Sequence, residues 1–281
     1  MVIQSGVYSA MVFGVKKSIR RQKPKGAFSL TINFSYFAAK NQPMIPPLEN
    51  LFVLDIETVS TSPEWKQVDD TWKDLWAKKI DKQLPEGENP ESFYPMRAAI
   101  LAEFGKIICI SAGYFREENG RYTFRIKSYS GHDEAELLRK FIHDAGQWQS
   151  KKKAASFAGH NIREFDIPYL CRRLLINQMP IPDWLNFQAM KPWETNLVDT
   201  MQLWRFGDFK NYTSLNLLAA CLDIPSPKGD IDGSMVGEVY WVQNDLPRIV
   251  EYCQRDVVTV AQVLLRFKHL PLLEDGEVVV V

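Results

Sequence analysis

The chain has 281 residues, of which 46% are hydrophobic, and a formal net charge of zero. These values are typical of a folded protein with one large α/β domain or two small ones, and they argue against a disordered chain. Residues 1–43 hold seven Lys and Arg and no acidic residue, so the remainder carries 27 basic against 34 acidic residues, a net charge of −7. That negative charge argues against broad, sequence-independent coating of duplex nucleic acid, and any polyanion contact should be local.

The cysteine usage and the hydropathy pattern both bear on the compartment. The four cysteines are far apart and form no C-x-x-C pair, so they predict neither a zinc knuckle nor a disulfide framework and favour a reducing environment. No apolar run approaches the roughly 20 residues that cross a bilayer, and the chain does not open on a signal-peptide pattern. We therefore expect a cytoplasmic protein.

Residues 1–43 differ in composition from the rest of the chain. They show no clear periodicity and are followed by prolines at positions 43, 46 and 47, which indicate a boundary. We interpret residues 1–43 as a basic N-terminal extension and residues 44–281 as the folded domain. Three uses of the extension stay open: an upstream extension of the reading frame that the domain does not need, a basic arm for nucleic acid, and an organelle-targeting segment.

The first clear strand is residues 51–58, Leu-Phe-Val-Leu-Asp-Ile-Glu-Thr. Residues two apart on a strand point to the same face, so Asp55 and Glu57 should project side by side while Leu54 and Ile56 enter the core. Two adjacent carboxylates repel each other unless they share a proton or hold a cation, and oxygen ligands suit Mg²⁺ or Mn²⁺. The alternative is a strand that ends in an exposed acidic turn.

The next stretch predicts aromatic packing followed by a hairpin. Trp65, Trp72 and Trp76 recur at helical spacing for one apolar face, which predicts packing in the core or a lid, or stacking on bases beside an active site. Residues 106–115 and 122–129 predict two strands joined by a turn at Glu-Glu-Asn-Gly, so the sheet should begin with an antiparallel meander.

A helix and a short strand then lead to a second acidic motif. Asp133 is available to cap a helix, and residues 154–159 predict the next strand. This strand runs into Asn161 and Asp166, after which residues 167–176 predict a helix. Asp166 should therefore lie beyond a strand end, at the edge where open α/β sheets bind ligands. Taken alone, Asp166 is better explained as a helix N-cap.

The last third of the chain predicts two further helices. Residues 196–201 predict a strand or its edge, where we interpret Asp199 as a structural cap rather than a fifth acid of the site. Residues 214–222 predict a capped helix, and the longest periodic segment covers 245–268. Tyr252 and Asp256 lie four residues apart on it and so share a face, which by itself indicates only a surface pair or a hydrogen bond at the core edge. Residues 274–281 have too little pattern to assign.

Three motifs in this order resemble the DEDD superfamily of 3′→5′ exonucleases, in its subtype with Tyr in the third motif. The motifs are Leu-Asp-Ile-Glu-Thr ending at Thr58, Gly-His-Asn-Ile-Arg-Glu-Phe-Asp ending at Asp166, and Tyr-Cys-Gln-Arg-Asp ending at Asp256. Two subsidiary stretches also fit the resemblance, Asp199-Thr200 with residues 212–219 and Ile-Asp-Gly-Ser at 231–234. The latter is similar to exonuclease domains of family B DNA polymerases and to stand-alone relatives of them. The resemblance spans about residues 51–267 and implies a ribonuclease H-like α/β fold with a mixed central sheet.

The resemblance also implies a mechanism and a set of roles. Two divalent cations, Mg²⁺ or Mn²⁺, would be held by Asp55, Glu57, Asp166 and Asp256, with Asp55 shared between them. Glu57 and Asp256 would hold the ion that activates a water, and the hydroxyl of Tyr252 would orient that water. These five residues form the implied catalytic set. The implied substrate-binding residues are Thr58, Asn161 and Phe165, although Phe165 can equally belong to the core.

The expected substrate is nucleic acid with a free 3′ end, single-stranded DNA in the first instance, and the choice between DNA and RNA stays open. No polymerase palm fits within 281 residues, so we expect any polymerase or repair partner to act in trans. One alternative is a non-catalytic module that binds nucleic acid or a partner on the same fold, against which the retained acids argue. Another is a hydrolase of free nucleotides or short oligonucleotides.

Overall fold

The computed structural model of the protein describes residues 45–281 except 153, 192–193 and 226–229. The basic extension predicted for residues 1–43 lies outside the described residues, and its boundary stays a prediction. Among the described helices, none is long and apolar enough to span a membrane.

A six-stranded mixed sheet forms the centre of the domain. Its strands are β1 (Leu51–Ser60), β2 (Gly105–Glu118), β3 (Arg121–Ser130), β4 (Ser156–Gly159), β5 (Leu197–Asp199) and β6 (Val278–Val280). The strand order is β5-β4-β1-β2-β3-β6. The first three strands are antiparallel neighbours, whereas β4 runs parallel to β1, β5 to β4 and β6 to β3. This topology confirms the predicted ribonuclease H-like sheet with its antiparallel meander.

The turn between β2 and β3 follows from two residues. Asn119 and Gly120 both have positive φ angles, 55° and 79°, as a two-residue hairpin turn requires. They lie inside the predicted Glu-Glu-Asn-Gly turn and confirm the hairpin.

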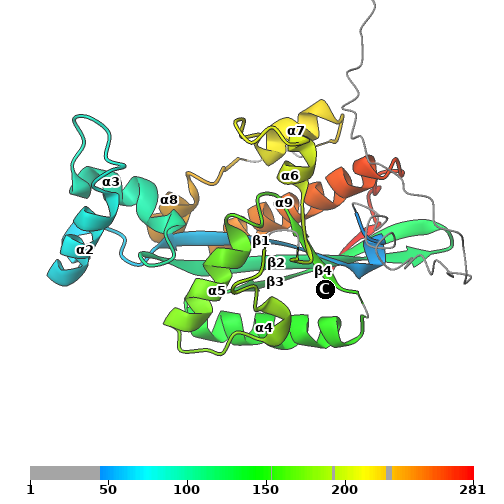
Figure 1. Cartoon of the computed structure of the whole chain (residues 1–281), viewed down its shortest axis with the longest axis horizontal. Helices are drawn as coiled ribbons and strands as arrows, with labels where there is room; N and C mark the ends of the chain where they lie inside the picture. The colour runs from blue at the N-terminus through cyan, green and yellow to red at the C-terminus, as the bar shows by residue number, and fades with distance from the viewer. Residues whose placement is uncertain (1–44, 153, 192–193, 226–229) are drawn as a thin grey trace, which may run out of the picture. The chain divides into compact units, whose positions relative to one another are not determined.

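Helices cover both faces of the sheet (Figure 1). One face carries α4 (Glu134–Ser150) and α5 (Asp166–Ile176), and the other carries α6 (Thr200–Arg205), α7 (Leu215–Cys221), α8 (Val236–Trp241) and α9 (Leu246–Phe267). Alternation along β1 supplies both cores: Leu54 and Ile56 pack on the α4 side, and Val53 packs on the α9 side. The predicted burial of Leu54 and Ile56 is confirmed, and the opposite face of β1 is left for Asp55 and Glu57.

Local capping explains where the helices begin. The side chain of Asp133 accepts a hydrogen bond from the amide of Glu136, as predicted. Ser214 caps α7 in the same way, and Asp245 caps α9, whose first turn holds a proline. These caps satisfy backbone donors that a helix leaves unpaired, and their substitution typically costs about 1 kcal/mol each.

An excursion between β1 and β2 builds a small core of its own at one end of the sheet (Figure 1). It consists of two α-helices, α2 (Asp70–Ile80) and α3 (Pro90–Arg97), and two 3-10 turns, η2 (Trp65–Gln67) and η3 (Ala98–Ile100). Two further 3-10 turns are η1 (Leu48–Asn50) and η4 (Asp183–Leu185).

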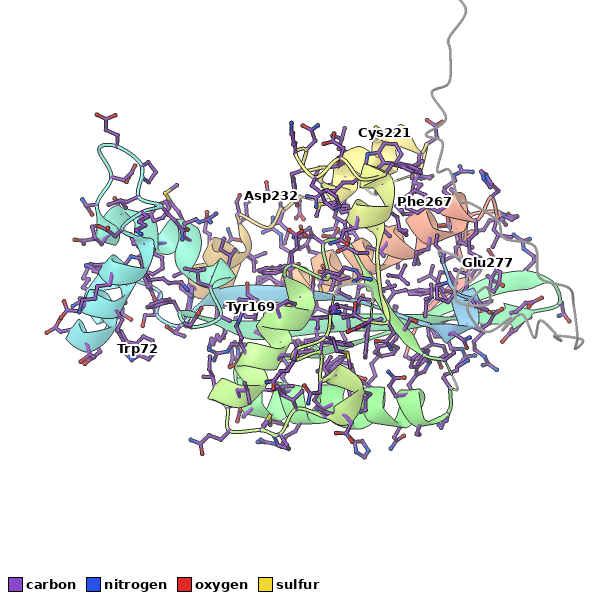
Figure 2. The ribbon with its side chains drawn as sticks, in the orientation of Figure 1. Trp72, Tyr169, Cys221, Asp232, Phe267 and Glu277 are labelled. Atoms are coloured by element: carbon purple, nitrogen blue, oxygen red, sulfur yellow. The ribbon has the colours of Figure 1, made fainter. Side chains whose placement is uncertain are left out.

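The prediction of one helical face for the three tryptophans is wrong for Trp65. Asp69 caps α2 by accepting from the amide of Thr71, so the helix begins after Trp65. Trp76 is fully buried, whereas Trp72 lies at the surface of α2 (Figure 2), with its ring centroid 5.6 Å from that of Phe104. The predicted packing in a core is confirmed for Trp76, which packs against Phe104 in this small core.

Candidate active site

Asp55 and Glu57 lie side by side on the face of β1 that α9 covers. Glu57 is buried and Asp55 is half-buried, and the Sγ atom of Cys253 on α9 lies 3.5 Å from both Asp55 O and Asp55 Oδ2. The pairing of β1 with β2 shifts register between Glu57 and Thr58. Such a bulge bends a strand and changes the direction of the side chains that follow it.

Asp166 reaches β1 from the edge that β4 pairs with. It is the first residue of α5, and its Oδ1 accepts a hydrogen bond from the amide of Ile56 at 3.2 Å. That amide is available because β4 pairs with β1 only over Leu51–Val53. The N-cap interpretation of Asp166 is therefore wrong, because Phe165 occupies the cap position. The Asp166 carboxylate instead accepts a hydrogen bond from the backbone of β1.

Helix α9 contributes Tyr252 and Asp256 from one of its faces. The carboxylate of Asp256 acts electrostatically on both Asp55 and Glu57, so the four acids of the three motifs meet at one site. The segment before α8 also reaches this site, since a Cβ atom added to Gly233 would lie 3.9 Å from the Tyr252 hydroxyl. Asp232, beside it (Figure 2), uses its carboxylate to hold Ser234 rather than to join the acids.

Burial and mutual repulsion both act on the acids. Burial raises the pKa of Asp55 and of Glu57 well above the usual value, and the neighbouring carboxylates raise both further. Burial also raises the pKa of Asp166 to about 7 and that of Asp256 to about 6. Burial, followed by repulsion from Asp256, raises the pKa of Tyr252, so its hydroxyl stays protonated near neutral pH.

This donor set fits divalent cations. Among the described residues, no Lys or Arg forms an ion pair with any of the four acids. Asp55, Glu57 and Cys253 offer ligand atoms that lie within 4.8 Å of one another. Carboxylate oxygens are the ligands that Mg²⁺ and Mn²⁺ prefer, and a bound cation would supply the positive charge that the buried acids lack.

The raised pKa values predict an unusual pH dependence of stability in chelator. Asp166 and Asp256 bind protons more tightly in the folded chain than in the unfolded chain. Their contribution to stability is therefore complete below about pH 4 and is lost as the pH rises through 6 and 7. From pH 5 to pH 8 we expect the free energy of unfolding to fall by roughly 2–4 kcal/mol.

Urea denaturation across this pH range measures the effect. Mg²⁺ should remove most of the loss, because the cation stabilises the ionised acids, and Asp166→Asn should remove the part of the loss above pH 6. A metal-free protein that is as stable at pH 8 as at pH 5 would contradict the electrostatic account of the site.

The predicted substrate residue Asn161 lies where β4 ends. Its φ angle is 61°, and its Oδ1 is buried without a hydrogen-bond partner among the described residues. Gly159 makes the close turn possible, because a Cβ atom there would lie 2.9 Å from the Cβ of Ile162 and 3.0 Å from the carbonyl oxygen of Leu54. The Asn161 side chain is thus held at the strand edge with an unused acceptor.

Asp199 organises the same loop. It caps α6 by accepting from the amides of Met201 and Gln202, as the structural interpretation predicts. Its two oxygens also accept from the amides of Asn161 and Arg163, at 3.1 and 3.2 Å. The sequence indicated the cap but not this second use of Asp199. The available signal was its place directly after the apolar pair Leu197-Val198 at the end of an expected strand.

Phe165 and Thr58 lie closer to the core than Asn161 does. The ring centroid of Phe165 is 5.4 Å from that of Tyr169, and Phe165 packs, half-buried, against the core on the α5 side. Thr58 is buried at the bulge in β1. Phe165 has the position of a residue at the edge of the core.

One protein family matches most of the chain that carries the second and third motifs. The family model described as "Predicted 3'-5' exonuclease related to the exonuclease domain of PolB" matches residues 100–274, a range that includes Asp166, Tyr252 and Asp256 but begins after Asp55 and Glu57. No curated protein matches the chain.

Two yeast structures are similar at 16% identity. One is a chain in the structure of the yeast NOT1 MIF4G domain co-crystallized with CAF1, with 79% of this chain and 84% of that chain covered and a TM-score of 0.36. The other is the RNase domain of the yeast Pop2 protein, with 79% and 81% covered and a TM-score of 0.32. The family match covers more than half of the sequence. The chain therefore belongs to the family of predicted 3′-5′ exonucleases related to the exonuclease domain of PolB.

Proposed function

We propose that the protein is a 3′→5′ exonuclease that removes nucleotides from the free 3′ end of single-stranded nucleic acid with two divalent cations, Mg²⁺ or Mn²⁺. The observation that carries the proposal is the meeting of four acids, of which Glu57 and Asp166 are buried and Asp55 and Asp256 half-buried, with no Lys or Arg paired to them among the described residues. Membership of an exonuclease family supports the reaction class. A module without catalysis would gain nothing from such repulsion.

The acids have the roles that charge and position favour. Asp55, Glu57, Asp166 and Asp256 would hold the cations. Bound cations would lower the pKa of a water and neutralise charge on the phosphate oxygens. Tyr252 lies one helical turn before Asp256, and its hydroxyl, kept protonated by burial and by neighbouring acids, would orient the attacking water. No strong protein base is needed in this arrangement.

The terminal nucleotide would contact the loop after β4. The buried Oδ1 of Asn161 has no partner among the described residues, and it would accept a hydrogen bond from the sugar of the last nucleotide. The ring of Phe165 would stack on the terminal base. Thr58, one residue after Glu57, would contribute through the backbone conformation at the bulge in β1.

A degradation series tests the proposal. Purified protein is expected to release mononucleotides from 5′-labelled single-stranded DNA only when Mg²⁺ or Mn²⁺ is present, and a blocked 3′ end should prevent release. The rate on RNA of the same sequence shows whether the protein prefers DNA or RNA. The rate on substrates of increasing length distinguishes a polymer-degrading enzyme from a hydrolase of short oligonucleotides. Undiminished activity in excess chelator would remove the two-cation account, and release from the 5′ end would remove the polarity.

A further inference from the structure

The connection between α6 and α7 presents three aromatic side chains to solvent. Phe206, Phe209 and Tyr212 are 85%, 73% and 66% exposed. Nearby Trp204 and Leu215, by contrast, pack into the core beneath α7. Three large rings in seven residues make a concentrated exposed apolar patch, and such patches on soluble domains mark interaction sites.

The backbone of this connection is fixed by polar contacts rather than by the rings. The side chain of Asn211 donates to Asp208 Oδ2 at 2.8 Å, and Arg205 Nε donates to the carbonyl oxygen of Asn211 at 3.3 Å. At its far end, His160 Nε2 lies 2.8 Å from the carbonyl oxygen of Thr213. Replacing the rings should therefore leave the loop in the same conformation.

Phe206 ends α6 in a conformation that usually belongs to Gly. Its φ and ψ angles are 46° and 32°, in the left-handed region. Residues with a bulky side chain rarely adopt this region. The phenyl ring gains no burial in return. A bulky ring that is held in water on a strained backbone suggests a use outside the folded core.

The loop is attached to the segment that carries the second acidic motif. His160, which bonds to Thr213 at one end of the loop, is the residue before Asn161. At the other end, Arg205 pairs with Glu164 at 3.5 Å, two residues before Asp166. Both ends of the aromatic loop are thus connected to the residues that surround the proposed 3′-terminal site, on the α6 and α7 side of the sheet (Figure 1).

The chemistry of the loop favours unpaired bases as its ligand. The domain outside residues 1–43 has a net charge of −7, so broad attraction to phosphates is weak and another source of affinity is needed. Aromatic rings supply it by stacking on bases, which tolerates any sequence. The exposed Lys210 lies between Phe209 and Tyr212 in the sequence, and its positive charge suits a contact with the backbone phosphate of the same strand.

We propose that Phe206, Phe209 and Tyr212 form a stacking platform for the unpaired nucleotides that precede the 3′ end. This inference rests on the proposed exonuclease function and adds a second contact region to it. Paired bases offer no free faces to the rings, so the platform selects a single strand over a duplex. It also makes affinity depend on strand length, because a longer strand has more bases to stack on the three rings.

Binding in chelator tests the platform without turnover. We would titrate protein into an oligo-dT of about 12 nucleotides, within the range that one single-strand-binding fold covers, carrying 2-aminopurine near its 3′ end. Phe209→Ala should weaken binding roughly five- to tenfold, and Phe206→Ala, Phe209→Ala and Tyr212→Ala combined roughly 100-fold. With Mg²⁺, the combined variant should lose much less activity on a dinucleotide than on the 12-nucleotide strand, because a dinucleotide has at most one base to stack beyond the terminal one.

Two substitutions at one position separate stacking from general apolar contact. Phe209→Trp keeps an aromatic face and should retain the affinity and the fluorescence quenching. Phe209→Leu keeps apolar bulk without a π-face and should lose both. Equal thermal melting of all variants checks that the fold is unchanged.

The outcomes distinguish this inference from the proposed function. Equal oligo-dT affinity in the combined variant and the unmodified protein would overturn the platform while leaving the exonuclease intact. Equal oligo-dT affinity of Phe209→Leu and Phe209→Trp would also overturn the platform. It would identify the loop as a surface for a protein partner or a second copy. Ring-dependent binding without metal-dependent cleavage would support the platform and overturn the exonuclease.

Discussion

Asp55→Ala is expected to reduce turnover on a 3′-terminated single strand by about 10³-fold or more, the scale of removing a central electrostatic contribution. Asp55 lies on the central strand, where Glu57, Asp166 and Asp256 all act on its carboxylate. Its loss would weaken cation binding and remove charge neutralisation together. Single-turnover kinetics at saturating Mg²⁺ measure the change.

Folding should survive this substitution. Burial and three neighbouring acids raise the pKa of Asp55, so removing it relieves repulsion in metal-free protein, and its melting temperature in chelator should equal or exceed that of the unmodified chain. Tyr252→Phe is the matched comparison, because it deletes one hydroxyl and keeps the ring. Its loss should be smaller, roughly 10²-fold, with binding little changed.

Two results would replace the enzyme by a binding module. The first is near-native nuclease activity in Asp55→Ala. The second is tight binding of 3′ ends by the unmodified protein with no metal-dependent cleavage of DNA or RNA.

Arg173→Met is expected to lower the free energy of unfolding by about 3–5 kcal/mol, the cost of breaking a buried ion pair from one side. Arg173 Nε and Nη2 donate to the two oxygens of Glu134, at 2.9 and 2.5 Å, and both side chains are buried. Glu134 also accepts from the amide of Ile107 and from Asn177. The pair thus joins α4, α5 and β2, and its loss would leave a carboxylate buried without a counter-charge.

Urea denaturation of three variants isolates this effect. Arg121→Met removes the partner of Glu274 and Glu277 at the surface and should cost much less, because exposed ion pairs contribute little to stability. Adding Glu134→Gln to Arg173→Met should recover part of the loss, because no buried charge then remains. The interpretation fails if Arg173→Met costs no more than Arg121→Met.

Periodic segments made most of the fold predictable from the sequence. The alternation of Leu54 to Glu57 gave the faces of β1 correctly, and the 3.6-residue pattern gave α9 with its start at Asp245. The three motifs identified the family because their residue types and order are specific even though each is weak alone. The family match supports that identification.

The remaining features depend on contacts between distant residues, which a single sequence does not report. Asp166 looked like an N-cap because a helix follows it, and its bond to the amide of Ile56 depends on where β4 stops pairing. The pairing of Glu134 with Arg173 is invisible for the same reason. The aromatic loop at 206–212 has no period, so its exposure emerges only from the fold.

The short strand β6, which had no readable pattern, pairs with Phe124–Ile126 of β3. Two further bonds extend the contact: the amide of Phe124 donates to Glu277 O at 2.7 Å, and the amide of Val281 donates to Ile126 O at 2.9 Å. Without it, this part of β3 would present unpaired backbone donors and acceptors, which can recruit a strand from another molecule. The last residues therefore cover an edge of β3 at which another chain could otherwise add a strand.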